Sequence, residues 1–213
     1  MAQSYRSVQS MRLVQIVLRS IFLVGVWTFG GIAHGQMVLQ KHLVIGLAGG
    51  GGITSTQSNW KELRSSAIAS SGVRFSFSYA FNERWSLGGQ YLRVGSVKFP
   101  GPVDRIRFTN YMIEGTYRFI NSDRHAVEIL LGAGITSMTL RPVDELLPYD
   151  AVGPVANAGI RYLFLINETI GLFAAFDHTQ APDHDVTHKE YAIDGYTIRW
   201  NSQRLTGGAF LRF

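Results

Sequence analysis

The 213-residue sequence contains no cysteine. This absence excludes a disulfide scaffold, a thiolate zinc site, a cysteine nucleophile and a lipid-modified cysteine. Charged residues are also scarce, at 16% of the chain against about 25% in an ordinary soluble protein. The formal net charge of +5 suggests a nucleic-acid partner, but three of the arginines lie in residues 1–35, which contain no acid. The 17 remaining basic residues against 15 acids leave a net charge of only +2, so we predict no nucleic-acid binding.

Long apolar runs are absent after residue 35, so the sequence predicts no membrane-spanning helix in that part. Before it, residues 1–19 are basic and polar, and residues 21–32 form an apolar run that ends in Ala33-His34-Gly35. This order is typical of a secretory signal peptide, and we predict that residues 1–35 are removed. A transmembrane anchor is the alternative interpretation, but a glutamine and an arginine interrupt the stretch that would form it.

The rest of the sequence alternates between apolar and polar residues, which is the pattern of a β-strand with two different faces. In residues 73–81 every odd position is large and apolar, whereas the even positions are arginine, serine or alanine. The pattern recurs along the chain and predicts eight strands. Their expected ranges are 41–53, 71–82, 85–99, 105–120, 125–141, 154–166, 170–181 and 194–213.

The predicted connections alternate between short and long. The short ones begin at Asn82, Asn121 and Asn167. The long ones are polar or contain proline, and they cover residues 54–70, 100–104, 142–153 and 182–193. This order predicts an all-β fold, an eight-stranded antiparallel up-and-down transmembrane β-barrel with short periplasmic turns and long outer loops. A soluble ligand-binding barrel with its apolar face turned inward is the alternative architecture.

The last strand carries the feature by which the chain resembles a known group. Apolar residues alternate up to the final position, and Leu205, Leu211 and Phe213 are among them. The arrangement resembles the C-terminal assembly signal of bacterial outer-membrane barrels. Residues 36–213 are therefore similar to the small OmpX-like and OmpA-transmembrane-domain-like barrels. The resemblance implies an outer-membrane location, a monomer and the barrel-assembly machinery as a partner during biogenesis, and it implies no catalytic residues.

Many charged residues of the strands fall on the polar face, which a transmembrane barrel of this kind turns inward. An eight-stranded barrel is just wide enough for side chains to fill it, and charges removed from water must pair. We therefore predict an interior charge network made of Arg74, Glu114, Arg118, Glu128, Arg161, Asp177, Arg204 and Arg212. In the alternative interpretation this network lines a narrow pathway for ions or small solutes.

Basic residues crowd the expected outer ends of the third and fourth strands. They are Arg93, Lys98, Arg105 and Arg107, with Arg141 and Arg199 at similar heights. Because the guanidinium group matches the geometry of phosphate oxygens, these residues predict contact with the phosphates of lipopolysaccharide. A charged rim that contacts only solvent is the alternative.

Histidines and carboxylates are dense from the end of the seventh strand into the last loop, at Asp177, His178, Asp183, His184, Asp185, His188 and Glu190. Their spacing matches neither a closed zinc pattern nor H-E-x-x-H, so we predict no metal site and no cofactor. An enzyme that modifies lipid A would need a serine beside His178, and Ser137 and Ser202 are the candidates. The glycine run at 49–52 precedes no phosphate-loop lysine, so we interpret it as structural.

These features predict a non-enzymatic outer-membrane barrel whose protruding strands and loops serve surface interaction or envelope integrity. Lipid, lipopolysaccharide and an extracellular partner of unknown identity are its expected contacts. A lipid A-modifying acyltransferase or deacylase, or a narrow pore, are the alternative functions.

Overall fold

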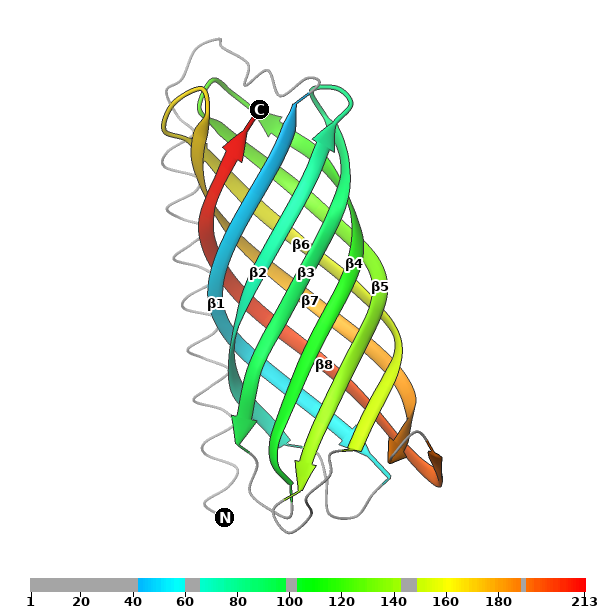
Figure 1. Cartoon of the computed structure of the whole chain (residues 1–213). Helices are drawn as coiled ribbons and strands as arrows, with labels where there is room; N and C mark the ends of the chain where they lie inside the picture. The colour runs from blue at the N-terminus through cyan, green and yellow to red at the C-terminus, as the bar shows by residue number, and fades with distance from the viewer. Residues whose placement is uncertain (1–41, 60–65, 99–102, 143–148, 189–190) are drawn as a thin grey trace, which may run out of the picture. The chain divides into compact units, whose positions relative to one another are not determined.

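The structure, a computed structural model, describes residues 42–59, 66–98, 103–142, 149–188 and 191–213. The predicted signal peptide lies outside these residues. They form a closed barrel in which each strand pairs antiparallel with its neighbours in sequence and β8 pairs with β1 (Figure 1). The strands are β1 (Leu43–Ser58), β2 (Ser66–Ala80), β3 (Trp85–Lys98), β4 (Val103–Asn121), β5 (His125–Pro142), β6 (Tyr149–Leu165), β7 (Ile170–His188) and β8 (Tyr191–Arg212). The predicted fold class is confirmed. Within the described ranges, no helix is long and apolar enough to cross a membrane.

The short turns lie at the same end of the barrel as the C-terminus, which we call the turn side (Figure 1). In the β2–β3 turn, the side-chain oxygen of Asn82 accepts hydrogen bonds from the backbone N–H groups of Arg84 and Trp85, both at 2.8 Å. Asn167 caps the β6–β7 turn in the same way. Such local bonds explain why asparagine leads these turns.

The strands extend further toward the opposite end, the loop side, than the sequence predicts. β1 continues to Ser58 rather than residue 53, and β7 continues to His188 rather than residue 181. β2 and β6 likewise begin about five residues earlier than expected. The predicted loops 54–70, 142–153 and 182–193 are therefore too long. Their polar, glycine-containing and proline-containing composition is typical of loops, but their inward side chains pack inside the barrel.

An apolar belt surrounds the turn-side part of the barrel. Its outward side chains are large and exposed, as at Ile113, which is 66% exposed. On β8 the belt runs from Leu205 to Phe213, about nine residues. At a rise of about 3.3 Å per residue and a tilt of about 40°, this length gives a height of about 23 Å, close to the apolar band of transmembrane barrels. The belt therefore has the dimensions of a lipid-facing surface.

Aromatic rings pair across strands at both edges of this belt. At the turn-side edge, Trp85 lies against Tyr117 with ring centroids 4.7 Å apart. At the loop-side edge, Tyr91 lies opposite Tyr111 with ring centroids 5.3 Å apart. Girdles of aromatic residues mark the two interfaces in transmembrane barrels, so these pairs place the membrane boundaries on the structure.

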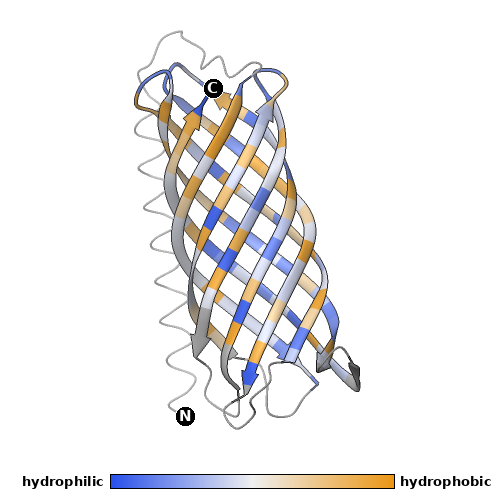
Figure 2. Ribbon diagram, in the orientation of Figure 1, coloured by the Kyte–Doolittle hydropathy of each residue, from blue (hydrophilic) through white to orange (hydrophobic). Residues whose placement is uncertain are grey.

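Beyond the Tyr91–Tyr111 pair the alternation along the strands reverses its phase. On β4 the outward residue changes from Ile113 to Arg107, while the inward residue changes from Glu114 to Phe108. Figure 2 shows hydrophobic and hydrophilic residues alternating along the strands. With water instead of lipid outside, apolar side chains are more stable inside. The loop-side end is therefore built like a soluble barrel that projects from the membrane.

An apolar core fills the loop-side interior, where the sequence had predicted a polar face. Its centre is Trp200, whose ring lies 4.6 Å from that of Phe108. The buried residues of this loop-side core are Leu92, Val94, Ile106, Phe108, Met112, Met138, Leu140, Ala151, Val155, Ala181, Val186, Ile198 and Trp200. A second, smaller apolar cluster fills the turn side around Phe173 and Phe210. The charged residues of the interior lie on the strands between these two clusters.

Candidate functional site

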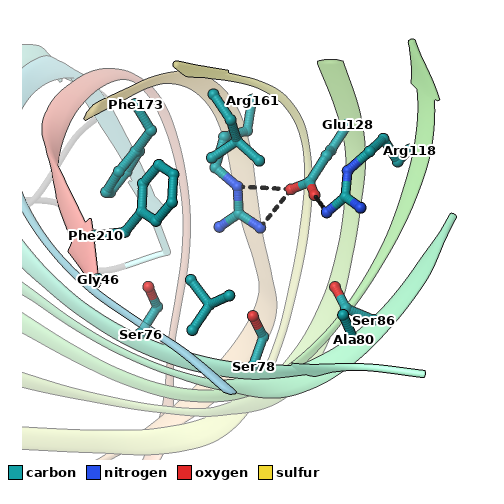
Figure 3. A pocket seen from close by; sticks show the side chains of 12 residues that line it. Gly46, Ser76, Ser78, Ala80, Ser86, Arg118, Glu128, Arg161, Phe173 and Phe210 are labelled. Atoms are coloured by element: carbon teal, nitrogen blue, oxygen red, sulfur yellow. Dashed lines mark hydrogen bonds and ion pairs between the residues drawn. The ribbon is translucent and has the colours of Figure 1, made fainter. Parts of the chain in front are cut away.

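Glu128 on β5 joins two arginines from the neighbouring strands (Figure 3). One carboxylate oxygen accepts from Nη2 of Arg118 at 2.5 Å, and the other accepts from Nε and Nη2 of Arg161 at 3.0 and 2.8 Å. Nη1 of Arg161 also lies 3.4 Å from Glu114 Oε1. Because the sheet register places Glu128 directly opposite both arginines, hairpin pairing alone brings these three residues together. Glu114, which is opposite Gly132 in the register, joins the cluster only through its contact with Arg161.

A second ion pair crosses the barrel between β2 and β7. Nη2 of Arg74 donates to Oδ2 of Asp177 at 2.6 Å, and both side chains are fully buried. Arg204 lies opposite Asp177 in the register but hydrogen-bonds to serine hydroxyls. Arg212 lies half-buried at the turn-side end of β8. The interior therefore contains the Glu128 cluster and the separate Arg74–Asp177 pair, and Arg204 lies beside Asp177, whose charge attracts it.

A small cavity lies below the Glu128 cluster (Figure 3). Its volume is about 20 Å³, room for about one water molecule. Ser76 and Ser86 line it on the side opposite the charges, and Phe173 and Phe210 line one end. The Arg161 guanidinium lies 6.0 Å from the centre of the Phe173 ring, within the range of a cation–π contact. Side chains thus fill most of this layer, as expected for eight strands.

Exposed arginines lie on the outer surface just beyond the Tyr91–Tyr111 pair. Arg93 on β3 is opposite Thr109, two residues from Arg107 on β4. Arg107 is opposite Thr139, two residues from the exposed Arg141 on β5. We call Arg93, Arg107 and Arg141 the cation row, since each is a diagonal cross-strand neighbour of the next.

The remaining basic residues predicted for this surface fall in different places. Lys98 pairs with Arg105 and Arg105 with Arg141 in the backbone register, but the side chains of Lys98 and Arg105 lie outside the described residues. Arg199 belongs to another part of the wall, where its Nε donates to Gln57 Oε1 at 2.6 Å. Beside the cation row, Asp150 on β6 accepts from the Thr139 hydroxyl at 2.9 Å.

The residues considered for catalysis are not brought together. His178 faces outward between Ala158 and Gln203, whereas Ser137 lies on β5 between Thr109 and Val152. Ser202 is buried inside the barrel, on the opposite face from His178. Neither candidate serine therefore has His178 as its partner.

The histidine and carboxylate cluster is also dispersed. Asp177 and His184 are buried, whereas Asp183 and Asp185 are exposed. The side chains of His188 and Glu190 lie outside the described residues. Among the residues that are described, no three histidine or carboxylate side chains come together as a metal site would require.

The three residues of the predicted assembly signal all face outward within the apolar belt. Leu205, Leu211 and Phe213 are exposed. Phe213 also closes the barrel, because its backbone N–H donates to Leu43 at 2.9 Å and its carbonyl accepts from Leu43 at 3.1 Å. Their role in assembly stays a prediction.

Several solved structures share this architecture, and one of them is the outer membrane protein OprG. No protein-family model matches the sequence, and no curated protein is similar to it at the sequence level. Neisserial surface protein A is 12% identical with a TM-score of 0.56, covering 81% of this chain and 97% of its own. OprG from Pseudomonas aeruginosa is 12% identical with a TM-score of 0.52, covering 82% and 96%. Ail, the attachment invasion locus protein of Yersinia pestis, is 14% identical with a TM-score of 0.50, covering 82% and 99%. This chain therefore shares the fold of these small barrels.

Two features of this barrel were missed by sequence reasoning. The first is the loop-side core. Its signal in the sequence is that Leu92 and Val94, which are apolar, lie on the same face of the strand as the polar Gln90. The second is a group of buried hydroxyls around Thr54, for which the sequence contains no signal. Thr54, Ser70 and Ser202 lie far apart in the sequence, and nothing around them indicates that three strands bring them together.

Proposed function

We propose that the protein is a closed, non-enzymatic barrel of the outer membrane whose projecting end binds the phosphates of surrounding lipopolysaccharide. The observation that carries this proposal is the position of the cation row. The row begins at Arg93, one outward residue beyond the Tyr91–Tyr111 pair, and continues through Arg107 to Arg141 toward the loop side. Phosphate groups meet a protein surface just beyond the aromatic girdle in such a membrane.

Electrostatics favours this contact. An arginine near an anionic lipid surface contributes about 1 kcal/mol of binding free energy, and the planar guanidinium can donate two hydrogen bonds to one phosphate. Arg93, Arg107 and Arg141 are all exposed, so they are accessible to such groups. An enzyme acting on lipid A is less well supported, because His178 has no serine partner among the described residues.

The first prediction concerns lipid that purifies with the protein. Replacing Arg93 and Arg107 with alanine should lower the amount of lipopolysaccharide per mole of purified barrel at least twofold, because two guanidinium groups that donate hydrogen bonds to phosphate are lost. The matched control is the Arg84→Ala, Arg124→Ala double variant, which removes two exposed arginines from the turn side. Quantitative phosphate and sugar analysis of the detergent extracts is the measurement. Equal lipopolysaccharide content in both variants would contradict the proposal.

The second prediction concerns conduction. Reconstituted barrels should give no stepwise currents in planar bilayers, because the loop-side core and the Phe173–Phe210 cluster fill the interior on both sides of the charges. A variant with Met138→Gly and Leu140→Gly, which thins that core, provides the comparison. Currents from the unmodified barrel that scale with salt would show a pore and overturn the closed-barrel part of the proposal.

A further inference from the structure

Three buried hydroxyl groups from three different strands meet inside the barrel, on the loop side of the ion pairs. Thr54 Oγ1 on β1 lies 2.8 Å from Ser70 Oγ on β2 and 3.1 Å from Ser202 Oγ on β8. All three side chains are more than nine-tenths buried. We call them the hydroxyl cluster.

Arg204 completes this cluster. Its Nε donates to Ser202 Oγ at 3.1 Å and its Nη2 donates to Ser70 Oγ at 3.4 Å. The guanidinium passes across β1 to reach β2. Glycines leave space for it along the way: a Cβ at Gly52 would lie 2.9 Å from Cγ of Arg204, and one at Gly72 would lie 2.8 Å from its Nη1. Gly52 and Gly72 thus leave room for the Arg204 side chain as well as for the backbone carbonyls of Gln203 and Arg93, which lie closer still.

The cluster has more hydrogen-bond donors than acceptors. Because Thr54 donates its only proton to Ser202, Ser70 is the donor in the Thr54–Ser70 bond. Ser202 Oγ then accepts from both Thr54 and Arg204, so its own proton is available for a further acceptor. Arg204 has five N–H groups, of which two are used in these bonds. A further acceptor at this place would complete the hydrogen bonding.

The charge of the interior points to an acceptor that is an anion. Among the described residues, four arginines but only three carboxylates are buried. Glu114 and Glu128 bind Arg118 and Arg161, while Asp177 binds Arg74. Arg204 lies opposite Asp177 in the register and shares its attraction with Arg74, but its own hydrogen bonds go to neutral hydroxyls. The four buried guanidinium groups therefore exceed the three buried carboxylates by one positive charge.

We propose that the hydroxyl cluster and Arg204 bind one small monovalent anion of the size of chloride. Hydroxyl and guanidinium N–H donors suit such an ion, and it neutralises the excess positive charge, which water does not. The loop-side core sets an upper limit on the size of the ion, because Trp200 is the next but one residue on the inward face of β8 after Arg204 and Thr56 lies opposite it. The Trp200 Nε1 and Thr56 Oγ1 atoms are themselves buried without a partner, so this wall offers two more donors.

Bromide is the direct probe, because its anomalous scattering distinguishes it from water. The full barrel is refolded and crystallised in bromide salt. An anomalous peak within about 3.5 Å of the Arg204 guanidinium and the Ser202 hydroxyl is the expected result. A refined interior with water at this place and no anomalous signal would overturn the proposal.

Unfolding in solution provides the second test. An ion that binds only the folded state stabilises it, so exchanging gluconate for chloride at equal ionic strength should raise the unfolding midpoint by about 3 to 6 °C at tenfold saturation. Arg204→Met should abolish this chloride dependence. Arg199→Met, on the outward face of the same strand, is the control and should retain it.

The test also holds where Arg204→Met does not fold. The Thr54→Val, Ser202→Ala double variant keeps the arginine and removes two hydroxyls, and it too should lose the chloride-dependent shift. A shift of equal size in this variant and in the unmodified barrel would show that chloride acts elsewhere, and the proposal would be wrong.

Discussion

Replacing Glu128 with glutamine is expected to lower the free energy of unfolding by about 3–5 kcal/mol. Glu128 is only 1% exposed, and its two oxygens hold the guanidinium groups of Arg118 and Arg161. Without the carboxylate charge, these two buried arginines would have only the weak 3.4 Å contact with Glu114 as an ion pair. Unfolding of the detergent-solubilised barrel by denaturant, followed by circular dichroism, is the measurement.

Two further variants separate the role of the ion pairs from that of the fold. Glu168→Gln changes an exposed carboxylate in the β6–β7 turn and should alter the unfolding free energy by less than about 0.5 kcal/mol. The quadruple variant Glu114→Gln, Arg118→Met, Glu128→Leu, Arg161→Met removes all four charges of the cluster together, so it should be more stable than Glu128→Gln. If Glu128→Gln were no less stable than the Glu168 control, the interior charges would not be paired as described.

Replacing Trp200 with alanine is expected to cost about 3–5 kcal/mol of unfolding free energy. Trp200 is 2% exposed and packs against Phe108 in the loop-side core, so its loss leaves a cavity where no lipid can enter. The control is Trp85→Ala, because Trp85 is 54% exposed in the turn-side girdle and its removal leaves no enclosed cavity. Equal losses from the two variants would contradict a packed apolar core in the projecting end.

Much of the barrel follows from the sequence because alternation over nine or more residues leaves few other folds. Residues 73–81 show this pattern without interruption, and the asparagine-led turns fix the order of the hairpins. The inward position of Arg74, Glu128 and Asp177 follows from the same alternation. Their partners do not, because the Arg74–Asp177 pair joins residues 103 positions apart across the barrel.

The parts that sequence reasoning missed depend on where the membrane ends. Alternation shows that two faces differ, but it does not show which solvent each face meets. When β4 passes from lipid to water, its apolar residues change from the outward to the inward face between Tyr111 and Phe108. A strand reading based on one phase therefore ends too early and assigns Val186 to a loop, although its side chain is buried.

Site-directed spin labelling tests the central claim, that the outward surface changes from lipid to water at the Tyr91–Tyr111 pair. Because the chain has no cysteine, each introduced cysteine is the single labelling site. Labels at Ile113→Cys and Leu205→Cys should collide mainly with oxygen dissolved in lipid. Labels at Arg107→Cys and Asn201→Cys, on the same two strands, should collide mainly with a water-soluble nickel complex. Strong nickel collisions at all four positions would mean that the belt lies in water and that the barrel is soluble, which would contradict the account.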